Sequence, residues 1–494
     1  MVQRTPTSTE AELEVSFGYH SKARDMPRGC EVVFPGTQFC PSSVPSFSYL
    51  SGAALSANAT LANTNICHGL IGEDILPSRD SPKSFRKIPS CSSLSKLEQL
   101  SSSLHSSTSI SSCSPPWQTN SFENDSFLKP MRVRCPSDVF LNVMEVTAAG
   151  GAAGEDRVQA ICSEENGLLF CGIYDGFNGR DAADFLAGTF YDTIMSYLDP
   201  LLSWELNQGF PESFDGLEAD KSPPSMFNGL QQKTESTLTQ LQQGIVESLR
   251  NALVDAENEF LNMVEQEMDD RPDLVSIGSC VLAVLLHGND LYTLNLGDSR
   301  AVLAKYDGKD LKAVELTENH NVDNQVERNR LLREHPDDPK TVVMGKVKGK
   351  LKVTRALGVG YLKKEVLNDA LMGILRVRDL RSPPYISTQP AINLHTISSE
   401  DHFVVVASDG LFDFFSNDEV VRLINSFILE NPTSDPAKLI VEQLLLRAAD
   451  CAGLTLKELM DVPAGKRRNY HDDVTVVVIM LGMNQRTLKA STPI

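Results

Sequence analysis

The chain has 494 residues, which is enough for one large domain with a tail or for two to three small domains. Its 45 lysines and arginines oppose 65 aspartates and glutamates, and the net charge of -20 argues against nucleic acid or an anionic membrane as electrostatic partners. No apolar run approaches the roughly 18 residues of a membrane-spanning helix, and Val2 stands where an N-myristoyl acceptor needs glycine, so we expect no direct membrane anchor.

Residues 1–137 are rich in serine, threonine, proline and asparagine, with no sustained period of 2 or 3.6 residues. Such a composition buries too little apolar surface to offset the entropy lost on ordering, so we expect a largely disordered tail. Ser81 and Ser114 each precede a proline and are candidate phosphoacceptors, which suits a regulatory tail. A plain linker explains the composition equally well.

A strand-rich domain is predicted for residues 138–483, with a flexible tail at 484–494. The links between the apolar runs from Ser279 to Gly308 are too short for a parallel crossover, which predicts an antiparallel meander. Residues at about 204–236 are rich in turn formers and are expected to form an insertion. Apolar residues that recur every three or four positions predict helices outside the β core, among them Leu186, Phe190, Ile194 and Leu198, and then Leu241, Ile245, Leu249, Ala252, Ala256 and Phe260.

Four acidic motifs abut apolar, strand-like runs: Glu155-Asp156, Asp175, Asp409 and Asp472-Asp473. A single aspartate in such a place is most often a turn residue. Four together predict a cation, because clustered anions repel one another and oxygen ligands suit the hard ions Mg²⁺ or Mn²⁺. Two such ions would bind a phosphate and activate water, which predicts the hydrolysis of a phosphate ester.

The ordered motifs "GEDR", "YDGFNG", "SIGSCVLAVLL", "LNLGDSRAVL", "LKVTRALG", "ASDGLFDFF" and "YHDDVTVVVI" span roughly residues 138–482. In this set the chain resembles the metal-dependent type 2C (PPM) serine/threonine protein phosphatases, and among them the plant Poltergeist-like subgroup. The resemblance implies an α+β fold in which an antiparallel β-sandwich is flanked by helices on both sides. It also implies hydrolysis of phosphoserine and phosphothreonine by a water molecule that bridges two metal ions.

The resemblance implies roles for individual residues. Asp175 matches the carboxylate that bridges both ions, and Gly176 matches the carbonyl ligand beside it. Asp409 and Asp472 match the remaining carboxylate ligands, so Asp175, Asp409 and Asp472 are the implied catalytic residues.

Three further acidic residues match outer positions of the family's site. Glu155 matches the residue that holds metal-bound water, whereas Asp298 and Asp413 match positions tied to a third, weaker metal ion. The implied cofactors are therefore two Mg²⁺ or Mn²⁺ ions with a third, weaker site.

The chain departs from the family at two positions. Phe177 stands where many members have a histidine that can act as the general acid, and Gly151 stands where many have an arginine that holds the substrate phosphate. Arg157 is a candidate replacement, although its strand parity is opposite to that of Asp156. Because the three carboxylate ligands are kept, we favour an active hydrolase over a scaffold that is weakly active or inactive and binds signalling partners.

Other charged residues near these motifs allow two interpretations. His320 and His471 are candidates for the general acid, but a lone histidine is more often structural. Asp473 replaces the asparagine common in the family and is expected to affect metal affinity. The residues Lys346, Lys348, Lys350 and Lys352 alternate with Val347, Gly349, Leu351 and Val353, which predicts a strand with a basic face, either a protective sheet edge or a rim for anionic substrates.

The ten cysteines are scattered and include no C-x-x-C pair, which favours free thiols in a reducing compartment. We therefore expect a monomer in the cytoplasm, the nucleus or both, with membrane association through a partner left open. The expected partners are phosphoprotein substrates and protein kinases of a signalling pathway.

Overall fold

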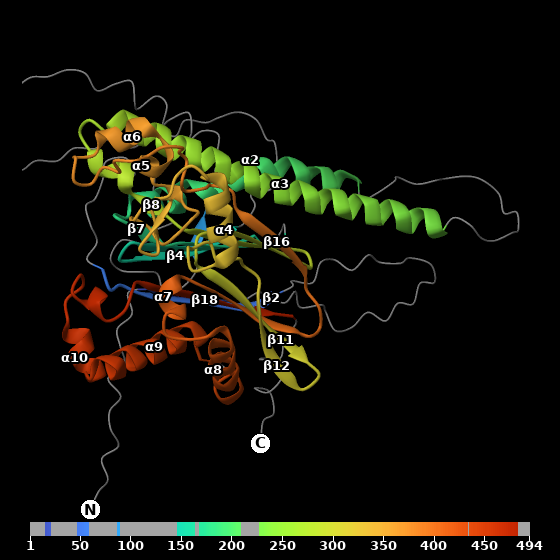
Figure 1. Ribbon diagram of the computed structural model, residues 1–494. Helices are drawn as coiled ribbons and strands as arrows, with labels where there is room; N and C mark the ends of the chain where they lie inside the picture. Colours follow the sequence, from blue (N-terminus) through green and yellow to red (C-terminus); the bar gives the residue numbers. More distant parts are fainter. Residues whose placement is uncertain are drawn as a thin grey trace, which may run out of the picture. The chain divides into compact units, whose positions relative to one another are not determined.

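Two antiparallel β-sheets lie face to face at the centre of the protein (Figure 1). The computed structural model describes residues 15–20, 47–58, 86–88, 146–163, 167–208, 227–432 and 434–482, all within one unit of the chain. The candidate phosphoacceptors Ser81 and Ser114, and the predicted tail at 484–494, lie outside the described residues.

The first sheet has the strand order β1-β2-β18-β17-β11-β12, and each neighbouring pair is antiparallel. It therefore joins strands from both ends of the chain. In that order its strands are Val15–His20, Phe47–Leu55, Val474–Leu481, Asp401–Ala407, Arg300–Asp307 and Asp310–Glu315.

The second sheet has the order β16-β10-β9-β6-β5-β4-β3 and is also antiparallel throughout. Its strands are Ala391–Thr396, Asp290–Leu296, Val281–His287, Leu168–Tyr174, Asp156–Ser163, Val146–Ala153 and Arg86–Ile88.

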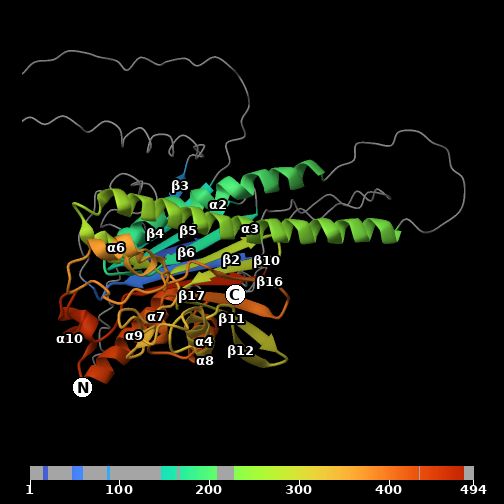
Figure 2. The ribbon, with the colours of Figure 1, turned by 45° about the horizontal axis from the view of Figure 1, so that its top comes forward.

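Helices cover the outer face of each sheet, so the layers follow the predicted α-β-β-α order (Figures 1 and 2). Helices α2 (Asp181–Gln208) and α3 (Phe227–Glu267) pack on the second sheet, and α8 (Asn417–Glu430) and α9 (Pro436–Ala452) pack on the first. A third core between the sheets contains side chains of both, such as Leu50 and Leu282. The predicted apolar faces of α2 and α3 are buried, as the helical periodicity required.

Among the described residues, no helix combines the length and the apolar character needed to cross a membrane.

Shorter elements complete the domain. The shorter elements are β7 (Gly176–Phe177), η1 (Pro272–Ser276), β8 (Gly278–Ser279), α4 (Gln325–Glu334), β13 (Val342–Val343), β14 (Lys346–Val347), β15 (Leu357–Gly358), α5 (Gly360–Lys363), α6 (Glu365–Ala370), α7 (Asp409–Phe412), α10 (Leu456–Asp461) and η2 (Arg467–Asn469).

The predicted domain boundary at residue 138 is wrong for three segments, because β1 and β2 belong to the first sheet and β3 belongs to the second. Strand β2 is buried along almost its whole length, so its sequence has no alternation of apolar and polar residues to announce it. Its Gly52 gives room to the Phe17 ring of β1, whose Cζ lies 2.2 Å from where a Cβ of residue 52 would be.

The predicted meander from Ser279 to Gly308 is only half correct. Strands β9 and β10 form a hairpin, but the chain then crosses to the other sheet and begins β11. Gly297 makes this crossing with a φ of 131°, and its missing side chain leaves room for the Cys280 thiol. The crossing places Asp298 at the end of both sheets.

The lysine-rich segment is not a strand with one basic face. Only Lys346 and Val347 pair with β13, and the chain then turns at Lys348, which has a φ of 51°. The Lys348 ammonium is buried and lies 2.7 Å from the Asp338 carboxylate, so this lysine is a structural partner.

The expected insertion is shorter than its predicted range of 204–236. Helix α2 continues to Gln208 and α3 begins at Phe227, so both helices extend into that range. Only residues 209–226 between them lie outside the described residues.

Replacing Leu50 by alanine tests whether the N-terminal strands stabilise the domain. Leu50 is fully buried in β2, so Leu50→Ala should lower the free energy of unfolding by about 2–5 kcal/mol. The matched variant Leu429→Ala, at a side chain of α8 that is 70% exposed, should change it by about 0.5 kcal/mol or less. Denaturant unfolding measures both, and equal small effects would place β2 outside the cooperative core.

Candidate metal centre

The acidic motifs converge at one end of the sandwich because the strands that precede or follow them end there together. The register pairs Arg157 with Tyr174, Arg300 with Ala407, and Ala407 with Val476. Each of these residues lies next to, or within a few residues of, one of the acidic motifs. Strand ends in two packed sheets hold such side chains at fixed positions.

The carboxylates of Asp175 and Asp298 share a small space with the Cys280 thiol, and one ligand atom from each lies within 4.8 Å of the others. Burial raises the pKa of Asp175 well above its usual value, and the charges of Asp409, Asp156, Asp472 and Asp298 raise it further. Asp175 therefore lies beside Asp298 and within electrostatic reach of Asp409 and Asp472.

Asp409 begins helix α7 directly after β17 and has the same electrostatic surroundings. Burial raises its pKa, followed by the charges of Asp298, Asp472 and Asp413. Asp413 itself is exposed, at the edge of the cluster.

Glu155 supplies a test of whether a cation fits this cluster. Its Oε1 atom is buried and has no hydrogen-bond partner among the described residues. Burial, and then the charge of Asp473, raise the pKa of Glu155 to about 7. A buried carboxylate oxygen without a donor, beside several mutually repelling carboxylates, fits a hard divalent cation such as Mg²⁺ or Mn²⁺.

Gly176 and Gly410 are needed for space and not for a left-handed backbone conformation. Neither has a positive φ. A Cβ on Gly176 would lie 2.6 Å from the Glu155 carbonyl oxygen, and a Cβ on Gly410 would lie 2.2 Å from the Asp473 carbonyl oxygen. Each glycine therefore lets one acidic motif pack against the backbone of another.

Asp473 is an anchor for the backbone. Its Oδ1 atom accepts hydrogen bonds from the amides of Ala57 (2.6 Å) and Asn58 (2.9 Å), and its Oδ2 atom accepts one from the Glu155 amide (2.9 Å). These donors join the end of β2 to the turn that carries Glu155. The effect of Asp473 on metal affinity stays a prediction.

The structure explains both departures from the family pattern by packing. The ring of Phe177 lies 2.8 Å from where a Cβ of Gly278 would be, and a methyl group of Val15 lies 2.5 Å from where a Cβ of Gly151 would be. No side chain fits at position 151 unless β1 moves. Arg157 does not replace the missing arginine, because it is buried and its guanidinium bonds to Asp184.

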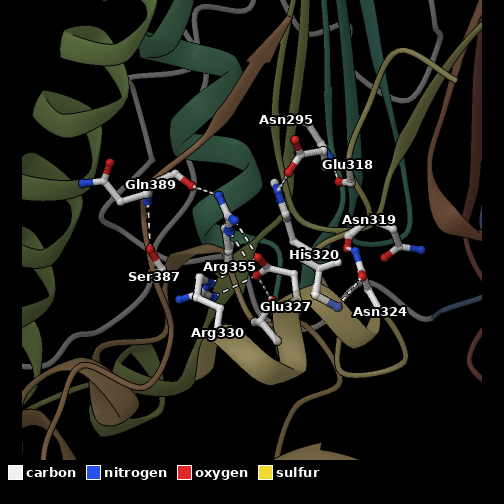
Figure 3. Close-up of polar contacts among 12 residues, drawn as sticks. Asn295, Glu318, Asn319, His320, Asn324, Glu327, Arg330, Arg355, Ser387 and Gln389 are labelled. Carbon is white, nitrogen blue, oxygen red and sulfur yellow. Dashed lines mark hydrogen bonds and ion pairs between the residues drawn. The ribbon is translucent and has the colours of Figure 1, made fainter. Parts of the chain in front are cut away.

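The two candidate histidines are buried and have lowered pKa values. Burial, and then the charge of Arg355, lower the pKa of His320 to about 3. The Nδ1 atom of His320 accepts a hydrogen bond from the Gly297 amide, and Nε2 lies 3.9 Å from Glu318 (Figure 3). His471 Nδ1 lies 2.6 Å from the Asp472 carbonyl oxygen. Both are neutral structural residues at neutral pH.

The ion-pair network in Figure 3 holds the loop that carries His320. The carboxylate of Glu327 accepts hydrogen bonds from Arg330, Arg355 and Thr354. The Thr354 amide in turn donates to the His320 carbonyl oxygen. Because His320 bonds to Gly297, this network supports the turn that positions Asp298.

Asp156 and Cys280 also belong to the cluster. In the sequence Asp156 is part of an acidic motif without a role of its own, and Cys280 belongs to no such motif. Asp156 is buried and accepts a hydrogen bond from Thr475 Oγ1 at 2.7 Å. The Cys280 Sγ atom lies 3.5 Å from Asp298 Oδ1. The place of Asp156 beside Glu155 was a signal for its role, whereas Cys280 lies in an apolar run that gives no such signal.

Comparison with known proteins gives the family. The family model described as Protein phosphatase 2C matches residues 219–450. A relative named Probable protein phosphatase 2C 40, from Arabidopsis thaliana, is 57% identical over 98% of this chain and 99% of its own length. The chain belongs to the protein phosphatase 2C family.

Two further proteins are similar to this chain. Probable protein phosphatase 2C 39 from Oryza sativa subsp. japonica is 54% identical over 98% of this chain and 94% of its own length. The solved serine-threonine phosphatase 2C from Toxoplasma gondii is 19% identical over 69% of this chain and 95% of its own, with a TM-score of 0.42.

Membership defines the activity. The protein is a metal-dependent serine/threonine phosphatase that hydrolyses phosphoproteins and depends on Mg²⁺ or Mn²⁺. The cluster of Asp175, Cys280 and Asp298 lies where such an ion fits.

The raised pKa values predict how the stability of the metal-free protein depends on pH. A carboxyl group with a higher pKa in the folded state binds its proton more tightly there, so deprotonation destabilises the fold. Glu155 and Asp472, whose folded pKa values are about 7 and about 6, should reduce stability as pH rises from about 4 to about 7. The deprotonation of Glu155 alone should lower the free energy of unfolding by about 3 kcal/mol over this pH range.

Thermal unfolding in a chelator, repeated with excess Mg²⁺, measures this effect. The loss of stability with rising pH should be largest in the chelator and should shrink with Mg²⁺. A metal-free stability that rises over the same pH range would contradict the predicted repulsion.

Proposed function

We propose that Asp175, Asp409 and Asp472 are the catalytic carboxylates and that they hold two divalent ions together with the Gly176 carbonyl oxygen. The support is electrostatic: the charges of Asp409 and Asp472 add to the raised pKa of Asp175, and the charge of Asp472 adds to that of Asp409. Asp175 would bridge the two ions, as the resemblance to the family implies, and its carboxylate shares a small space with Asp298.

Three further acidic residues would complete the site. Glu155, whose buried Oε1 atom has no donor within the described part of the chain, would hold water in the coordination shell. Asp298 and Asp413 would bind a third, weaker ion. The charges of both raise the pKa of Asp409 beyond the effect of burial, and Asp298 also accepts a hydrogen bond from Asn321.

The bound ions would polarise water and neutralise the charge that develops on the phosphate. The protein's own part is to hold the carboxylates in place. Strand ends fix Asp175 and Asp409, and Asp473 binds the Glu155 amide. The side chains of Asp175, Asp409 and Asp472 are only partly buried, which leaves the cluster open to a phosphate group from solvent.

We also infer a narrower setting for the enzyme from the sequence motifs and charge. The motifs resemble the plant Poltergeist-like subgroup, and kinases of a signalling pathway would supply its phosphoprotein substrates. The net charge of -20 disfavours electrostatic binding to nucleic acid or to an anionic membrane. We propose a monomer of the cytoplasm, the nucleus or both, with a regulatory segment among the residues before 138.

Removing one carboxylate at a time tests the proposed roles. Asp175→Asn and Asp409→Asn should each lower turnover of a phosphothreonine peptide with Mn²⁺ by more than the roughly 10- to 100-fold typical of residues that only support metal ligands. Calorimetry should show a matching loss of Mn²⁺ affinity.

The matched control is Asp310→Asn, at an exposed aspartate of β12, which should retain wild-type turnover and Mn²⁺ binding. Unchanged activity in both site variants would refute the assignment. A wild-type protein that binds Mn²⁺ and phosphopeptide without turnover would instead support the scaffold hypothesis, which Phe177 and Gly151 motivate.

A further inference from the structure

Position 151 cannot supply a cation for the substrate phosphate. The place of its side chain is filled by Val15 of β1, and the nearby Arg157 is buried and bonded to Asp184, Gly154 and Asp156. A phosphate dianion at the carboxylate cluster would nevertheless need donors beyond the ions, because the surrounding side chains are acceptors.

Arg468 lies at the edge of this cluster. Its Nη2 atom is 2.5 Å from Asp472 Oδ2, and its side chain is 49% exposed. Asp472 is the one carboxylate with which it forms an ion pair in the described part of the chain. The guanidinium carries five N–H donors in a planar fork, so donors remain for a second anion after it has paired with Asp472.

The turn that presents Arg468 is rigidly held. The neighbouring Arg467 is buried, and its guanidinium donates to the carbonyl oxygens of Ser56 and Val462. The Gly465 amide donates to the Ala57 carbonyl oxygen. The turn is therefore tied to the end of β2, and the position of Arg468 does not depend on its pair with Asp472 alone.

The charge of Arg468 also reaches the interior of the site. It lowers the pKa of Glu155 and of Asp472, against the larger opposing effect of burial in both groups. The charge of Lys352 lowers the pKa of Asp298, against the larger effect of burial. The Lys352 side chain is 63% exposed, and its ammonium lies 3.6 Å from the Asp323 carboxylate. A lysine is a point charge without the planar fork, so it fits a phosphate oxygen less specifically.

We propose that Arg468 binds a phosphate oxygen of the substrate at the mouth of the carboxylate cluster, while it pairs with Asp472 through Nη2. The proposal rests on the proposed function, because it assumes that the phosphate lies against Asp175, Asp409 and Asp472. Arg468, which precedes the last acidic motif, would then bind the substrate phosphate, a role that Gly151 cannot fill.

The test compares Arg468→Gln, Arg468→Lys and the matched control Arg422→Gln, at an exposed arginine of α8. With Mn²⁺ bound, Arg468→Gln should raise KM for a phosphothreonine peptide and the Kd for inorganic phosphate by about 10-fold to 100-fold, the cost of a lost charged hydrogen bond. The lysine variant should recover part of this loss, and Arg422→Gln should match the wild type. Thermal unfolding should be close to wild type for all three, and phosphate binding is measured at saturating Mn²⁺, so that a change in Mn²⁺ affinity through the pair with Asp472 does not enter it.

Equal KM and equal phosphate Kd in Arg468→Gln and the wild type would overturn the proposal. A change in Mn²⁺ affinity alone, with phosphate binding intact, would also overturn it, since Arg468 would then act only on Asp472. If the wild type lacks turnover, the proposed catalytic roles fail, and phosphate calorimetry still decides: weaker binding in Arg468→Gln supports the proposal, and equal binding or no binding to either protein overturns it.

Discussion

The repulsion among carboxylates at one end of the sandwich is the constraint that the rest of the domain serves. Burial raises the pKa of Asp175 and of Asp409, and the charges of Asp156, Asp298 and Asp472 raise both further. Donors such as Thr475 and Asn321 bond to other carboxylates of the cluster. Each unit by which a carboxyl pKa rises means that the folded protein disfavours the ionised form of that group by about 1.4 kcal/mol. The large buried cores on both faces of both sheets keep these groups together despite that cost.

The N-terminal strands show how far the site depends on distant parts of the chain. Val15 closes the position of residue 151, and the end of β2 meets Asp473 and Arg467 through its backbone. Strand β1 therefore leaves no room for an arginine at position 151, and the end of β2 fixes the turn that carries Arg468. A loss of β2 would disturb the carboxylate turns as well as the sheet.

The sequence predicted the parts of this architecture that depend on local pattern. Buried faces of α2 and α3 follow from apolar spacing, and the acidic residues at strand ends follow from the run of apolar residues beside them. Long-range packing was not predictable in this way. Strand β2 has no alternation, the crossing at Gly297 depends on the space beside Cys280, and Lys348 is buried because Asp338 lies ten residues before it in a folded turn.

The source of the proton for the leaving group follows from the same packing. Phe177 occupies the position of the family's histidine, and its ring packs against Gly278. His320 and His471 are buried, and the lowered pKa of each keeps it neutral at neutral pH. Among the described residues near the cluster, no histidine therefore serves as the acid. Solvent water that reaches the partly buried Asp175, Asp409 and Asp472 is the proton source that this geometry favours.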